Sequence, residues 1–161
     1  MVFEKLKESI SYIRSKTSIK PQVGIVLGSG LGSFVNEVKV DVQIPFHEIP
    51  NFHSTTVEGH KGQLILGEIS GKSVVLLQGR LHYYEGHPME TVVFPTRTLA
   101  LLGIESLILT NSAGGFGDTM QAGEFMIIED HINLMGSNPL TGPNLKELGP
   151  RFPDMTEAYD R

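Results

Sequence analysis

The sequence predicts an α/β fold in which helices flank a mixed central β-sheet. Short apolar runs that end in Gly, Ser or Asn are typical of buried strands whose loops lie at one edge of a sheet. Three runs have this form: 24–32 (GIVLGSGLG), 74–84 (VVLLQGRLHYY) and 107–115 (LILTNSAGG). The dipeptide Ser70-Gly71 separates two further strand-like runs and is a hairpin signal, so we expect antiparallel pairs beside the parallel ones.

Apolar periodicity and turn residues predict the elements in chain order. Apolar residues at helical spacing predict a helix over 3–15. A second helix is expected over 89–102, where Gly103 would end the helix and Pro95 could kink it. A short helix is expected at 34–38. Strands are expected at 22–27, 38–46, 63–69, 72–78, 105–110 and 125–129, the last continued by 130–134.

The C-terminal part has a less regular pattern. Residues 136–153 are rich in Gly, Pro and Asn, and a stretch of this length is expected to be a functional loop or a subunit contact. Thr156 resembles a helix cap followed by a single helical turn, which is not stable alone. We therefore expect one α/β domain over residues 1–161 that is truncated at its C-terminus.

Composition restricts the function classes. The chain has 161 residues, of which 40% are apolar and 19% charged, which is enough for a domain with a sizeable core. The net charge of −5 argues against nucleic acid or a membrane surface as a partner. There is no cysteine and no apolar run of the ~20 residues that a membrane span needs. These features are compatible with a cytoplasmic protein, which is the localisation we expect.

Arg80, His82 and Tyr84 follow a predicted strand at alternate positions, so they share one face if the strand continues. Arginine can hold two oxygens of a phosphate or carboxylate, and histidine can donate a hydrogen bond or carry charge. A cation, an imidazole and a phenol at a strand end suggest an anionic ligand that carries hydroxyl groups. The alternative is a surface arginine beside an incidental histidine.

The two other strand ends are weaker signals when each is taken alone. The glycines of 28–32 allow the backbone to approach an anion, and Ser29 adds a hydroxyl. This stretch is neither a G-x-G-x-x-G motif nor a P-loop with Gly-Lys-Ser/Thr, so a plain tight turn is about equally supported. Asn111 and Ser112 offer donors after the third strand, where an ordinary turn is the alternative. The six histidines show no metal-binding spacing, and no G-x-S-x-G elbow of a serine hydrolase is present.

Six short stretches, each weak alone, are highly specific in their common order. They are Gly28–Gly32, Glu58-Gly59-His60, Gln78–Gly86, Thr110–Gly115, Asp130–Leu134 and Arg151-Phe152-Pro153. In this order, and over nearly the whole chain, the sequence resembles the trimeric purine nucleoside phosphorylase family that prefers inosine and guanosine. The resemblance implies a phosphorylase-type sheet and a pentosyltransferase of purine salvage, which splits a purine (deoxy)ribonucleoside with phosphate into free base and (deoxy)ribose 1-phosphate. It also implies a homotrimer with phosphate as co-substrate, without a cofactor or metal.

The resemblance assigns expected roles to residues at the predicted strand ends and in the long loop. The phosphate-binding residues would be Ser29, His60, Arg80, His82 and Ser112, the last through its backbone N–H. The nucleoside-binding residues would be Tyr84 at the ribose, Asn111, and Phe152, which would reach into the site of the next subunit. His82 and Glu85 would be the catalytic residues, with Glu85 orienting its neighbours. Several oriented donors suit this chemistry, because phosphate must be held without water beside a sugar that gains oxocarbenium character.

Two departures from the family pattern affect these expectations. Ser112 stands where many members have Ala, which changes little if only its backbone is used. The residues that recognise the purine, and a further phosphate-binding serine, would lie beyond residue 161, so the fragment alone is expected to be inactive and base preference stays open. The alternatives are a methylthioadenosine phosphorylase, a non-catalytic phosphate-binding fragment, and, less favoured, another nucleotide-binding α/β domain.

Overall fold

The computed structural model describes residues 1–54 and 61–160. The chain packs into two compact units, Met1–Ser112 and Ala113–Arg161, and each is described here by itself. The first unit contains the sheet and both α-helices.

A five-stranded mixed sheet forms the first unit, in the order β2-β3-β4-β1-β5. Its strands are β1 (Val23–Leu27), β2 (Lys39–Pro45), β3 (Gln63–Ile69), β4 (Lys72–Gln78) and β5 (Ser106–Leu109). β1 runs parallel to both β4 and β5, whereas β3 pairs antiparallel with β2 and with β4. The mixed sheet is therefore confirmed, and each of these five strands lies within one residue of its expected bounds.

Two helices pack against each other beside the sheet: α1 (Val2–Lys16) and α2 (Met89–Leu102). Leu6, Ile10 and Ile13 are buried, so the apolar stripe that predicted α1 is the stripe that it packs inward. α2 continues through Pro95 and stops at Gly103, whose φ of +96° suits a residue without a side chain. Within residues 1–54 and 61–160, none of the helices is long and apolar enough to cross a membrane.

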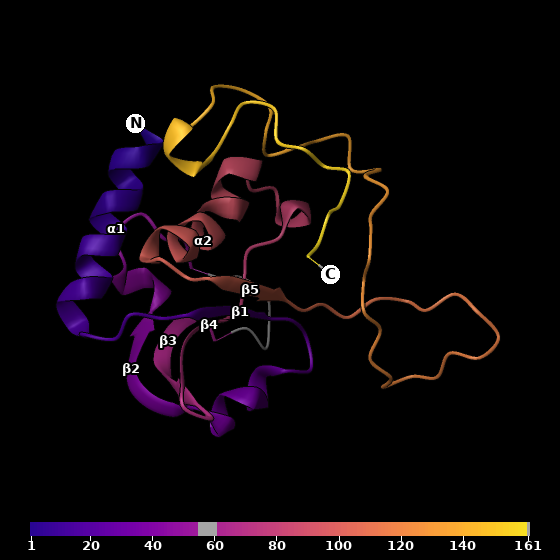
Figure 1. Cartoon of the computed structure of the whole chain (residues 1–161), viewed down its shortest axis with the longest axis horizontal. Coiled ribbons are helices and arrows are strands. Elements are labelled where there is room, and N and C mark those ends of the chain that lie inside the picture. Colours follow the sequence, from indigo (N-terminus) through magenta and orange to yellow (C-terminus); the bar gives the residue numbers. More distant parts are fainter. Residues whose placement is uncertain (55–60, 161) are drawn as a thin grey trace. The chain divides into compact units, whose positions relative to one another are not determined.

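The two faces of the sheet are covered by different elements (Figure 1). On one face, a Cβ placed on Gly24 of β1 would lie 3.4 Å from Leu99 of α2. On the opposite face, the alternate residues Ile25 and Leu27 pack in a cluster with the 3₁₀ helix η1 (Gly32–Glu37). β1 is thus buried on both sides, as its continuous apolar run predicts. The short helix expected at 34–38 is this η1, with 3₁₀ rather than α geometry.

In the second unit, two predictions are wrong. Residues 125–134 form no strand, and most of their apolar side chains are solvent-exposed, with Ile127 91% accessible. A strand needs a paired neighbour and a surface to pack on, and no strand of the described residues pairs with this segment. No helix starts at Thr156 either, because its N–H and hydroxyl both donate to Asp154 Oδ1, at 2.9 and 2.6 Å, in a local turn. Among residues 113–160, the regular element is the 3₁₀ helix η4 (Lys146–Leu148).

Candidate functional site

Three strand ends meet at one edge of the sheet. β1 lies between β4 and β5 and is parallel to both, with Leu27 paired to Gln78 and Val26 to Leu109. The loops that follow the three strands therefore start side by side. They carry Ser29 after β1, Arg80 after β4, and Asn111 and Ser112 after β5. This is the juxtaposition that the three Gly/Ser/Asn endings predict.

The loop after β1, residues 28–32, is called the glycine loop below. A Cβ on Gly28 would lie 2.5 Å from the carbonyl oxygen of Thr110 and 2.8 Å from Cα of Asn111, so only glycine allows the two backbones to approach this closely. Gly30 has a φ of +86°, which also favours glycine. Ser29 is exposed, so its hydroxyl and backbone are accessible to a ligand.

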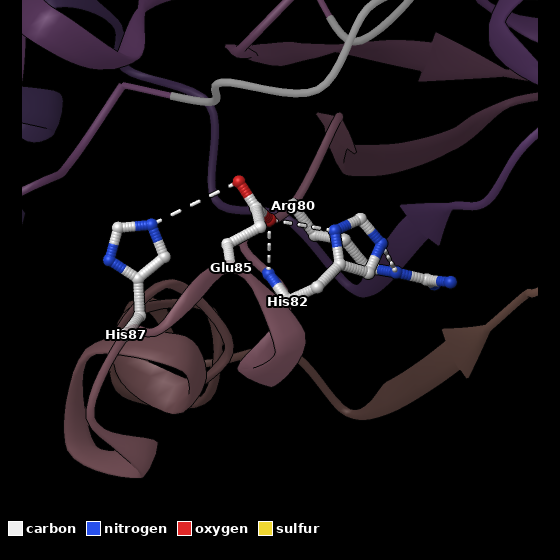
Figure 2. Close-up of polar contacts among 4 residues, drawn as sticks. All are labelled: Arg80, His82, Glu85 and His87. Atoms are coloured by element: carbon white, nitrogen blue, oxygen red, sulfur yellow. Dashed lines mark hydrogen bonds and ion pairs between the residues drawn. The ribbon is translucent and has the colours of Figure 1, made fainter.

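Arg80, His82 and Glu85 form a connected polar network (Figure 2). Glu85 belongs to the 3₁₀ helix η3 (Tyr83–Glu85), and its Oε1 accepts from the backbone N–H of His82 at 2.6 Å and lies 2.9 Å from His82 Nδ1. Oε2 of Glu85 lies 4.0 Å from Nε2 of His87. Oε1 of Glu85 therefore holds both the backbone and the ring of His82, and the contact with Nδ1 orients the imidazole.

These contacts indicate which nitrogen of the His82 ring carries the hydrogen. With a carboxylate at Nδ1, that nitrogen is the donor, and Nε2 of His82 is left to accept from Nε of Arg80 at 3.4 Å. Nη1 of Arg80 donates to the carbonyl oxygen of Thr110 at 2.5 Å. The guanidinium is thus fixed at two of its nitrogens between β4 and β5.

Arg80 supplies positive charge at a partly buried position. Burial lowers the pKa of the Arg80 guanidinium below its ordinary value, and the nearby Tyr84 acts in the opposite direction. The guanidinium keeps its charge at neutral pH because the ordinary pKa of arginine lies far above neutrality. A partly desolvated cation with oriented N–H groups is suited to bind a phosphate or carboxylate.

The other expected site residues lie in different surroundings. The ring of Tyr84 stacks on that of His82, with centroids 4.7 Å apart, and Tyr84 is 75% accessible. Asn111 and Ser112 are exposed at the start of the third loop, where Asn111 Nδ2 donates to Ser112 O at 3.2 Å. Phe152 belongs to the second unit, where it is 87% accessible and lies 5.9 Å from the guanidinium carbon of Arg151. His60 lies outside the described residues.

Two residues at this edge belong to the stretches that carry the resemblance, but the sequence assigned neither of them a site role of its own. Gln78 is buried at the end of β4, where its Nε2 donates to Gly32 O at 2.7 Å and its Oε1 accepts from Gln63 Nε2. Thr110 links the loop after β5 to β1 through its hydroxyl. The signal for Gln78 is a lone polar residue that ends the apolar run VVLLQ. Thr110 gives no comparable signal, because threonine is common in strands.

A metal centre has no support in the geometry of the described residues. Within residues 1–54 and 61–160, no group of three or more His, Asp or Glu side chains is arranged to hold a metal ion. The groups that the site offers to a ligand are hydrogen-bond donors and the guanidinium of Arg80.

Comparison with known proteins gives consistent similarities. The phosphorylase superfamily matches residues 22–161. Purine nucleoside phosphorylase 1 of Geobacillus stearothermophilus is 49% identical over 97% of this chain and 57% of its own length, and the Bos taurus purine nucleoside phosphorylase is 45% identical over 99% and 56%.

A solved structure is similar over the same span. It is the crystal structure of isoform 2 of purine nucleoside phosphorylase from Schistosoma mansoni with cytosine and ribose-1-phosphate, which matches with a TM-score of 0.91 at 44% identity. The match covers 99% of this chain and 57% of that one. The chain thus spans little more than half the length of the relatives it matches.

Proposed function

The chain belongs to the phosphorylase superfamily, and we propose that the complete protein is a purine nucleoside phosphorylase. In the proposed reaction, a purine (deoxy)ribonucleoside and phosphate give the free base and a (deoxy)ribose 1-phosphate. The observation that carries the proposal is the meeting of three parallel strand ends around the Arg80–His82–Glu85 network. The similarity to purine nucleoside phosphorylases over almost the whole chain supports it.

The chemistry requires a phosphate that is held beneath the sugar. A phosphate oxygen forms a bond to C1′, the C1′–N9 bond breaks, and the purine leaves with the electron pair and takes up a proton. Positive charge develops on the sugar as this bond weakens, and a fixed phosphate dianion stabilises it. Positioning matters because an oriented nucleophile reacts far faster than a free one.

We assign the phosphate to donors from the three strand ends and to His60. The phosphate-binding residues are Ser29, His60, Arg80, His82 and the backbone N–H of Ser112. Glu85 acts with His82 as the catalytic pair, since its carboxylate sets the orientation of the imidazole. Nε2 of His82 faces Nε of Arg80 in this structure, so it must release this contact before it can bind a phosphate oxygen.

The nucleoside and the assembly complete the proposal. Tyr84 contacts the ribose, Asn111 lies on the nucleoside side, and Phe152 enters the site of a neighbouring subunit in a homotrimer. The exposure of Tyr84 and Phe152 is compatible with both roles. The protein uses phosphate as co-substrate without a cofactor, and it acts in purine salvage in the cytoplasm. The single-domain organisation of residues 1–161 stays a prediction.

The test is phosphate-dependent base release by the full-length protein. Inosine, guanosine and methylthioadenosine are supplied with and without phosphate, and free base is measured by chromatography. We expect hypoxanthine and guanine to form only when phosphate is present. Turnover of methylthioadenosine alone would replace the proposal with a methylthioadenosine phosphorylase, and phosphate binding without turnover of any nucleoside would leave only a binding protein.

A further inference from the structure

Thr110 is the first residue after β5, and its backbone N–H and its hydroxyl bond across to β1 and to the start of the glycine loop. Its backbone N–H and its hydroxyl donate to the carbonyl oxygen of Val26, at 3.1 and 2.9 Å. Its Oγ1 also accepts from the N–H of Gly28 at 2.8 Å. One side chain therefore binds both the last part of β1 and the first N–H of the glycine loop.

The backbones of Gly28 and Thr110 are packed too closely to shift relative to each other. The backbones of Gly28 and Thr110 are so close that a Cβ on Gly28 would lie 2.5 Å from the carbonyl oxygen of Thr110. The hydroxyl bond and this close approach together fix where the glycine loop starts, and hence the direction in which it carries Ser29.

The backbone of Thr110 also contacts Arg80. Its carbonyl oxygen accepts from Nη1 of Arg80 at 2.5 Å, and Nε of Arg80 faces the imidazole of His82. Thr110 is thus bonded on one side to the glycine loop and on the other to the guanidinium. These are the two groups whose spacing decides whether one phosphate can contact both.

We propose that Thr110 is a positioning residue of the phosphate site, which sets the distance between the glycine loop and the Arg80 guanidinium through its hydroxyl and its carbonyl oxygen. The inference rests on the proposed function, because it takes phosphate to bind between the glycine loop and the guanidinium of Arg80. Its specific content is that the hydroxyl of Thr110 acts on phosphate binding although it is bonded to the backbone and does not touch the ligand.

The test compares three variants of the full-length protein by steady-state kinetics. Thr110→Val keeps the shape but removes the hydroxyl, Thr110→Ser keeps the hydroxyl, and Thr98→Val is a matched control. Thr98 is fully buried in α2, and its hydroxyl donates to Phe94 O of the same helix at 3.0 Å, so its loss should affect stability without removing a bond from the strand ends. We expect Thr110→Val to raise KM for phosphate about tenfold, as for the loss of a partly buried hydrogen bond. KM for the nucleoside should change less than about twofold, and Thr110→Ser should restore phosphate KM.

Several results would overturn the inference. They are an unchanged phosphate KM in Thr110→Val, an equal rise in nucleoside KM, a failure of serine to rescue, or the same phosphate effect in Thr98→Val. A second readout needs no turnover: the rise in Tm that inorganic phosphate causes should be smaller in Thr110→Val than in the parent and in Thr110→Ser. If the parent releases no base, the proposed function fails, and this Tm comparison alone decides the role of Thr110. If Thr110→Val does not fold, Thr110→Ala takes its place in the same comparison.

Discussion

At Arg80, the burial that lowers the pKa of the guanidinium also makes its charge costly to the folded state. A base with a lowered pKa binds its proton less tightly in the folded chain than in the unfolded one. Below both pKa values the arginine is charged in both states, so this cost is constant across neutral pH and is relieved only at high pH. The desolvated charge of Arg80 therefore does not by itself stabilise the fold, which is compatible with the anion-binding role proposed for it.

This leads to a prediction for Arg80→Met in the full-length protein. Phosphate-dependent base release should fall about 100-fold or more, because an oriented charged donor is lost. The thermal midpoint should change little, because relief of the desolvation cost and loss of the bond to the carbonyl oxygen of Thr110 act in opposite directions. Arg14→Met on the exposed side of α1 is the control, and it should change neither quantity. A phosphate affinity equal to that of the parent would remove Arg80 from the site.

A second prediction concerns the addition of a single Cβ atom at Gly28. In Gly28→Ala, the new Cβ meets backbone atoms of Thr110 and Asn111, which cannot rotate away. We expect a loss of stability of about 1–3 kcal/mol, the usual cost of overpacking, together with weaker phosphate binding. Gly32→Ala is the matched control, since its Cβ would lie 3.7 Å from Nε2 of Gln78, which is ordinary contact. Urea denaturation of both variants measures the difference, and equal midpoints would contradict the close approach of the two loops.

Among the elements, Gln78 connects three parts of the sheet edge. Its side chain bonds Gly32 at the start of η1 and Gln63 at the start of β3, and its carbonyl oxygen accepts from the N–H of Gly62 at 3.0 Å. A buried amide in an apolar sheet is stable only because these partners satisfy it. Gln78 thus holds the far end of the glycine loop, as Thr110 holds its start.

Replacing Gln78 with methionine tests this connection. Gln78→Met leaves the carbonyl oxygen of Gly32 without its donor, so we expect the free energy of unfolding to drop by about 1–3 kcal/mol. Gln43→Met is the control, because Gln43 is an exposed glutamine of β2 in the same sheet. The urea midpoints of the two variants, at equal protein concentration, provide the measurement. A smaller loss of unfolding free energy in Gln78→Met than in Gln43→Met would show that the hydrogen bonds of the Gln78 side chain do not stabilise the fold.

How far the elements could be predicted depends on where their stabilising contacts lie. β1, β4 and β5 were predictable because their apolar runs and terminal loops are local signals, and the order of parallel strands then brings the loops together. The segment 125–129 has an equally apolar pattern but forms no strand, since a strand depends on a neighbour that the sequence pattern does not specify. The position of Arg80 could be predicted in the same way, whereas its bond to Thr110 depends on the register between β4, β1 and β5.

For the whole molecule, the apolar surface of β5 is the most informative feature of the sheet. β5 is an edge strand among the described residues, and Leu107, Ile108 and Leu109 are 39–50% accessible. An edge of this kind, with unpaired backbone groups and large apolar side chains, favours association with other chains. The relatives extend well beyond the matched span, which covers 57% of the Geobacillus protein. We expect the remainder of the full-length protein to cover β5.

This expectation predicts that one substitution has opposite effects in two chains. In residues 1–161 alone, Ile108→Thr should lower aggregation and the binding of a fluorescent hydrophobic dye, because it removes exposed apolar surface. In the full-length protein, the same change should reduce stability by about 1–3 kcal/mol, because a buried position then loses apolar contacts and gains a hydroxyl. Val40→Thr is the control, since Val40 is 41% accessible in β2 at the opposite edge and should behave alike in both chains. Equal effects of Ile108→Thr in the two chains would mean that β5 stays exposed in the complete protein.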